Sequence, residues 1–335
     1  MTFHLAHSSA SGLRLSYYRQ AQGVCQYVQK QVLDAHGCFS IPLQPAEIPR
    51  LQRAVFTTGT IYATLGPTNV DRAVQEQIRA LELVIQPPLP NPSTERYTLR
   101  DMLLATCTAG HVMSSPDSHS SGPDFSSILH TDINSRLGDP TVNLLYLAHA
   151  SGDQLLQALL RAGGGVLPAP LLLPEQVMRL RTLLFPESKG VFPAICTRNS
   201  NGQLKPPSDT VRQQTNSLTS TILLTLAKRF QDHHVGKAVI PGPGATLPVS
   251  TSVVILLYYL ALAWTPSPST YNNLGIVLSG ISETRKGPDG EQLDGTALAR
   301  LFYTAGLQLD PKHPHLLTNL GSLLKDQGRI DQAIK

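Results

Sequence analysis

Apolar residues recur at the spacing of one helix face in several separate segments, and stretches rich in Gly, Pro and Ser lie between these segments. The segment 253–264 is apolar throughout, but it is much shorter than the roughly 18 residues that a membrane-spanning helix needs. We therefore expect a buried helix there. Further helices are expected over 13–36, 51–65, 70–85, 143–162, 175–185 and 219–232.

The clearest pattern lies at the end of the chain. Gly321 and Ala333 are expected where two antiparallel helices approach each other, because larger side chains would push the helices apart. Gly328 is expected to end the first helix, since glycine tolerates the left-handed conformation that closes helices. Large residues at helical spacing complete one face: Leu317, Leu320 and Leu324. The segment resembles the tetratricopeptide repeat, a hairpin of two helices.

A second copy of this pattern precedes the first. Its first helix is marked by Tyr271, Leu274 and Gly275, and its second helix and closing proline by Ala299, Tyr303, Gly306 and Pro311. The two Leu-Gly pairs are farther apart than the 34-residue period of the family, and the surplus falls in the polar, Gly/Pro-containing stretch 282–293. We interpret this stretch as a loop insertion, which costs little.

Less regular copies are expected upstream. A third hairpin is predicted over 219–264, and looser ones over 51–85, with a break at Gly66 and Pro67, and over 143–162. The predicted fold is all-α, an α-solenoid of tetratricopeptide-like hairpins that diverges in its N-terminal half. Four segments are expected: an N-terminal helix and linker (1–45), divergent hairpins with a mobile Ser/Pro-rich insert at 114–123 (46–162), a linker with one helix (163–210) and the repeats (211–335).

Composition and charge limit the partners and the location that we expect for the protein. The net charge is only +4 and no block of like charges occurs, so neither nucleic acid nor a membrane is an expected partner. Charged residues make up 15% of the chain against about 25% in an average domain, which favours surfaces that meet other proteins. The N-terminus lacks the pattern of a secretory signal, and the four cysteines have no short spacing. The expected location is the nucleus, the cytoplasm or both.

Catalytic motifs are missing from the sequence. It contains no Gly-x-Ser-x-Gly, His-Glu-x-x-His or phosphate-binding loop, so no catalytic residue, metal site or cofactor is predicted. Cys107 and His111 are spaced to share a helix face, but two ligands do not make a zinc site, and a buried thiol beside a surface imidazole is the preferred interpretation. His233 and His234 are interpreted as a solvated loop pair.

Two asparagines recur at the same repeat position. Asn273 and Asn319 each precede a Leu-Gly pair, although asparagine is a poor residue for the interior of a helix. A side-chain amide both donates and accepts, so it could hold the backbone of an extended peptide whatever its sequence. The alternative from the residues alone is that these asparagines only cap or solvate their helices.

The stretches 271–275, 309–311 and 320–334 are together similar to the repeat region of O-GlcNAc transferases, particularly fungal members with long insertions between helices. The resemblance implies that Asn273 and Asn319 belong to an asparagine ladder that holds protein or peptide clients. It also implies that a separate domain transfers GlcNAc from UDP-GlcNAc to Ser and Thr. Because the chain stops within a predicted helix, we expect that domain to lie beyond Lys335.

The alternative is a free-standing tetratricopeptide adaptor, and self-association through the repeats is a further expectation. A co-chaperone type that grips a C-terminal carboxylate is disfavoured, because it needs Lys and Asn at the fifth and ninth repeat positions. Those positions hold Asn272, Thr318, Ile276 and Ser322. Whether the parent protein is an enzyme stays open at this stage.

Overall fold

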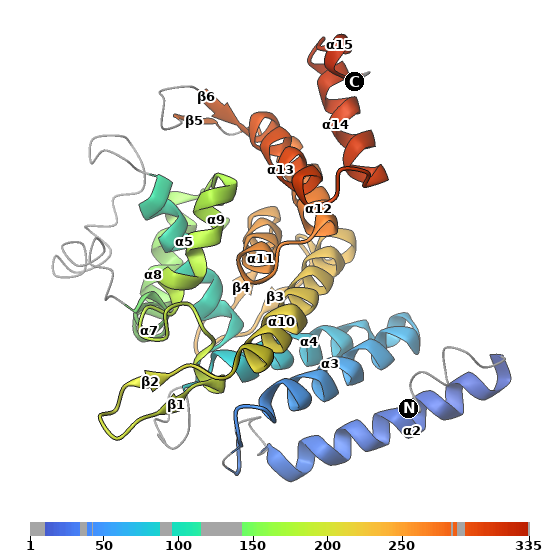
Figure 1. The fold of residues 1–335 in the computed structure, drawn as a ribbon, viewed down its shortest axis with the longest axis vertical. Coiled ribbons are helices and arrows are strands. Elements are labelled where there is room, and N and C mark those ends of the chain that lie inside the picture. Colours follow the sequence, from blue (N-terminus) through green and yellow to red (C-terminus); the bar gives the residue numbers. More distant parts are fainter. Residues whose placement is uncertain are drawn as a thin grey trace. The chain divides into compact units, whose positions relative to one another are not determined.

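The structure is a computed structural model. It describes residues 11–33, 39–41, 43–87, 96–114, 143–282, 284–286 and 292–333 (Figure 1). The insert expected to be mobile at 114–123 lies outside this description except for Ser114, and so do most of the loop residues between 283 and 291.

The described chain is mostly helical, which confirms the all-α prediction. The strands found there form short antiparallel pairs: β1 (Thr197–Arg198) with β2 (Leu204–Lys205), β3 (Val239–Ile240) with β4 (Leu247–Pro248), and β5 (Thr284–Lys286) with β6 (Gln292–Asp294). Each pair closes a loop between helices. The predicted insertion at 282–293 therefore coincides largely with the pair β5 and β6, and the stretch 239–248 contains the pair β3 and β4.

The chain divides into two compact units. The first unit joins Met1–Leu99 to Val191–Ile222, and the second joins Arg100–Gly190 to Leu223–Lys335. Helix α10 (Asp209–Arg229) contributes its beginning to the first unit and its end to the second. The expected segments were drawn consecutively along the sequence, so they could not represent units that each combine two stretches of chain.

In the first unit, α2 (Ser11–Val32) packs against α3 (Ile48–Thr64), and α3 packs against α4 (Val70–Ile85). Gly66 has a φ of +118° and is followed by a 3-10 turn, Pro67–Asn69, so the break expected at this point is confirmed. Buried polar contacts also occur: Gln29 donates to Thr58 at 3.1 Å and Gln52 donates to Thr219 at 2.9 Å.

The second unit contains α5 (Leu99–Ser114), α7 (Leu144–Ala150), α8 (Gly152–Ala162), α9 (Pro174–Leu184) and α11 (Thr251–Trp264). The stretch 143–162, where a loose helical hairpin was expected, forms two helices that meet at Ser151. Every residue from Val253 to Trp264 is buried, as predicted for this apolar run. Helix α5 was not predicted as a separate helix, although it is buried along most of its length.

The second unit continues through α12 (Pro268–Ser279), α13 (Gly295–Leu309), α14 (Pro314–Asp326) and α15 (Ile330–Ala333). Helix α12 packs against α13, and α13 packs against α14 (Figure 1). A Cβ at Gly275 would overlap the ring of Tyr303, and one at Gly306 would lie 2.7 Å from Leu316 and 2.9 Å from Tyr271. These glycines allow close helix packing, as the sequence predicted for Gly275.

Gly328 ends α14 as expected. Its φ is +72°, its N–H donates to the carbonyl of Lys325 at 2.9 Å, and the N–H of Arg329 donates to the carbonyl of Leu324 at 2.8 Å. This pair of hydrogen bonds is the Schellman motif, which needs a left-handed residue after the helix.

Two expectations for α14 need correction. Leu317 was placed on the packed face with Leu320 and Leu324, but it is 48% exposed, and Leu316 is the residue that packs against Gly306. Gly321 was expected at a close helix approach, yet a Cβ there would meet only the carbonyl of Ala333 at an ordinary 3.6 Å. Leucines occupy adjacent positions of this helix, so sequence spacing alone did not decide which of them faces the core.

Candidate functional site

A pocket of about 440 Å³ lies in the second unit, between the end of α10 and the start of α12. Its lining combines charged, hydroxyl, amide and apolar side chains: Leu224, Thr225, Lys228, Arg229, Asp232, His233, Ser269 and Asn273. The volume falls within the range of roughly 300–1,000 Å³ that is typical of ligand sites.

Local sequence explains how the pocket is built. Helix α10 continues into a π-helical turn, Phe230–His234, and Phe230 is buried in the core while Asp232 and His233 are exposed. The opposite wall begins at Ser267, whose side chain accepts from the N–H of Thr270 and so caps α12. Pro268 then starts the helix, so that Ser269 lies in its first turn and Asn273 one turn later.

Asn273 belongs to a chain of side-chain contacts that crosses several helices. Asn319 of α14 donates through Nδ2 to Oδ1 of Asn272 at 2.8 Å, and Asn272 donates through Nδ2 to Oδ1 of Asn273 at 3.3 Å. Tyr258 of α11 donates to Oε1 of Gln231 at 2.7 Å. Burial and the nearby Asp232 carboxylate raise the pKa of Tyr258, and a hydrogen bond with Asn273 partly offsets this rise.

The structure thus links the two asparagines singled out by the sequence, but through a third. Asn272 is only 8% exposed, and both ends of its amide are used within the protein. Sequence analysis considered Asn272 only as a position of a carboxylate clamp and treated Asn273 and Asn319 as independent. The Asn-Asn dipeptide was the sequence feature that could have predicted this contact, because its two side-chain amides are neighbours in the chain.

The cations of the pocket differ from the asparagines, because no hydrogen bond or ion pair joins them to another described side chain. In the part of the chain that the structure describes, neither Lys228 nor Arg229 forms an ion pair, and Nε of Arg229 is buried without a hydrogen-bond partner. Burial lowers the pKa of Arg229, although an arginine remains charged at any physiological pH. This pair was not predicted from the sequence, since two basic residues at a helix C-terminus are an ordinary pattern.

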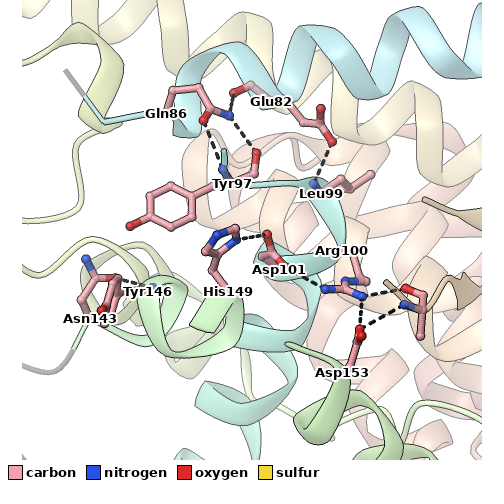
Figure 2. A network of polar contacts seen from close by, with 11 residues as sticks. Glu82, Gln86, Tyr97, Leu99, Arg100, Asp101, Asn143, Tyr146, His149 and Asp153 are labelled. Atoms are coloured by element: carbon pink, nitrogen blue, oxygen red, sulfur yellow. Dashed lines mark hydrogen bonds and ion pairs between the residues drawn. The ribbon is translucent and has the colours of Figure 1, made fainter. Parts of the chain in front are cut away.

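A second polar cluster of the same unit surrounds Arg100 (Figure 2). Arg100 is 1% exposed; its Nη1 donates to Oδ1 of Asp153 at 2.7 Å and to the carbonyl of Ala245 at 2.6 Å. Its Nη2 lies 3.6 Å from Oδ1 of Asp101, whose Oδ2 lies 3.0 Å from Nδ1 of His149. The cluster joins the start of α5 to α7, to α8 and to the loop before α11.

The surroundings of Arg100 leave little room for a ligand. A Cβ added at Gly152 would contact Nη2 of Arg100 at 2.5 Å, and one added at Gly242 would overlap its side chain. The N–H of Ala245 donates to Asp153 at 3.1 Å, and this bond, with the bond from Arg100, lowers the pKa of that carboxyl. We interpret this cluster as a structural clamp on the helix ends.

Figure 2 also draws contacts of the first unit that order the segment before α5. Glu82 accepts from the N–H of Leu99 at 3.1 Å, and Gln86 exchanges hydrogen bonds with the backbone of Tyr97. Glu82 also accepts from Arg96 at 2.8 Å. These bonds satisfy backbone groups around the beginning of a helix, which is also a structural role.

Cys107 and His111 both interact with the same backbone carbonyl, that of Pro168. The thiol of Cys107 donates to the carbonyl of Pro168 at 3.1 Å, and burial raises its pKa. His111 is not the surface imidazole that the sequence suggested: it is partly buried against the same carbonyl, and burial lowers its pKa. Within the described ranges no cluster of three or more potential metal ligands occurs, and no helix there could cross a membrane.

Comparison with known protein families gives no matching family model. Comparison with curated proteins gives no match either.

Proposed function

We propose that the second unit binds extended segments of other proteins, and that the pocket beside Asn273 is the contact site. The observation that carries the proposal is the pocket itself, which combines the apolar side chain of Leu224 with hydroxyl and amide groups and with two cations that form no ion pair among the described residues. Peptides need both kinds of contact, because apolar burial gives affinity and polar groups fix the path of the backbone.

We further propose that α12 to α15 are hairpins of the tetratricopeptide type. Support comes from the close approach of Gly275 to Tyr303, from the contact of Gly306 with Leu316 and from the left-handed Gly328. On this proposal the chain is the client-holding part of an O-GlcNAc-transferase-like protein of the nucleus or cytoplasm. A free-standing adaptor, with self-association through exposed residues such as Leu317, is the alternative.

Two glycines of this segment offer a matched test of the hairpin packing. Gly275→Ala should lower the free energy of unfolding by about 1–3 kcal/mol, because the added methyl group overlaps a buried ring. Gly321→Ala should be neutral or raise it by about 0.5–1 kcal/mol, since the helix gains alanine and nothing is crowded. Urea unfolding followed by circular dichroism measures both. Equal effects of the two substitutions would argue against the proposed hairpin packing.

The binding proposal is tested with a panel of fluorescein-labelled peptides of unrelated sequence, followed by anisotropy. Asn273→Ala should weaken most of the peptides by a similar factor, on the order of threefold to tenfold, because the lost hydrogen bonds go to backbone groups. Asn216→Ala is the control, since Asn216 is also a half-buried asparagine within a helix but does not line the pocket. Equal affinities for wild type, Asn273→Ala and Asn216→Ala, with unchanged thermal unfolding, would remove the proposed role of Asn273.

A further inference from the structure

The charges of the pocket suggest which kind of peptide it prefers. Lys228 and Arg229 contribute two positive charges and Asp232 one negative charge, so the lining carries a net charge of +1 when His233 is neutral. No ion pair within the described residues neutralises Lys228 or Arg229. By contrast, the equally charged Arg100 has two acceptors within 3 Å.

Arg229 gives the strongest support for an acidic ligand in the pocket. A buried donor without an acceptor costs free energy, and the cost is larger for a charged group than for a neutral one. Nε of Arg229 is in this state, and so is Nε of Arg100. The terminal nitrogens of Arg100 have acceptors, however, whereas Arg229 is only partly buried and lines the pocket. An acceptor that enters the pocket would form charge-assisted hydrogen bonds with the guanidinium and the Lys228 ammonium.

We propose that the pocket takes the carboxylate side chain of a Glu or Asp in the bound peptide, with Arg229 and Lys228 as the recognising cations. The inference rests on the proposed peptide-binding function and specifies its ligand class. Ser269 and Asn273 add neutral hydrogen-bonding groups, and Ser269 lies in the first turn of α12, where the helix dipole favours an anion.

The negative charge of Asp232 affects whether the pocket is expected to prefer a carboxylate or a phosphate group. One carboxylate carries one negative charge, which matches the net charge of the lining. A phosphorylated side chain carries nearly two negative charges at neutral pH, so one of them would stay uncompensated in the pocket, and the dianion would lose more hydration on entry than a carboxylate. The pocket is therefore expected to prefer an unmodified acidic residue to a phosphorylated one.

The test uses anisotropy with one extended, fluorescein-labelled peptide made in three forms, with a central Glu, Gln or phosphoserine. Wild type should bind the Glu form about tenfold more tightly than the Gln form and more tightly than the phosphoserine form. Arg229→Ala should abolish the preference for Glu over Gln while the affinity for the Gln form changes little. The control is Arg300→Ala, because Arg300 is a half-buried helical arginine that does not line the pocket.

A charge-preserving variant separates the recognition of charge from folding. Arg229→Lys keeps the charge but loses the guanidinium fork, so it should retain only part of the preference, and its circular dichroism melt should match wild type. Equal binding of the Glu and Gln forms would overturn the inference and leave peptide binding intact. Tighter binding of the phosphoserine form would overturn the choice of a carboxylate. No binding of any form would overturn both the inference and the proposed function.

Discussion

The second unit contains two polar regions with opposite designs. Around Arg100 each charged side chain lies near an oppositely charged one, although Nε of Arg100 and Oδ1 of Asp101 lack a hydrogen bond among the described residues, and a Cβ at Gly152 or Gly242 would crowd the arginine side chain. Around Asn273 the cations lack ion pairs and an open pocket stands beside them. The difference gives a way to assign a role to a buried polar group. A group that is paired and has no cavity beside it is interpreted as structural, and a group that lacks an ion pair and lines a pocket is interpreted as a binding group.

The hydrogen-bonded asparagines Asn319, Asn272 and Asn273, the asparagine chain, combine features of both regions. The amides of Asn319, Asn272 and Asn273 are bonded to one another, so part of their capacity serves the packing of α12 against α14. Only Asn273 also lines the pocket. The two asparagines that the sequence treated alike therefore differ: Asn273 lines the proposed binding pocket, and Asn319 is bonded to Asn272 outside it.

The largest expected effect concerns the paired region. Arg100→Met should lower the free energy of unfolding by about 3–5 kcal/mol, because it leaves the buried Asp101 carboxylate without this cation and removes the donor to Asp153 and to the carbonyl of Ala245. Arg161→Met, on the exposed surface of α8 in the same unit, should change it by less than about 0.5 kcal/mol. Urea unfolding of both variants measures the difference. A loss below about 1 kcal/mol for Arg100→Met would show that its bonds contribute little to the fold.

A smaller effect is expected in the asparagine chain. Asn319→Ala removes the donor to a side chain that is almost fully buried, so the free energy of unfolding should fall by about 1 kcal/mol, even though alanine is the better helix former. Asn216→Ala should have no such cost. Thermal unfolding by calorimetry compares them, and a melting temperature of Asn319→Ala at or above wild type would place Asn319 outside the supporting structure.

Helix periodicity predicted much of the fold. The ends of α4, α9 and α11 lie within one or two residues of their expected positions, because capping residues and prolines mark them. The roles of Gly275 and Gly328 were also predictable, since each has a steric reason that acts locally. By contrast, α5 was missed: most of its surface is buried, so it lacks the polar face that reveals a helix.

The site was less predictable than the fold. Asn273 was found because it recurs with the repeat, but Lys228 and Arg229 come from a different helix. Only the three-dimensional structure shows that they form no ion pair with the described residues. The same holds for the Arg100 cluster, whose acceptors at Asp153 and Ala245 lie far along the chain. Sequence spacing can place residues on one helix face, but it does not reveal which charges find partners from other elements.

Hydrogen–deuterium exchange of the full chain, with and without a saturating acidic peptide, tests the central claim most directly. Binding at the pocket should slow amide exchange in segments 224–234 and 268–274, which form its walls. Exchange around Arg100 and in 149–153 should stay unchanged, because that cluster is proposed to hold the fold and not the ligand. Protection confined to the Arg100 cluster, or absent from both walls of the pocket while the peptide is bound, would contradict this assignment.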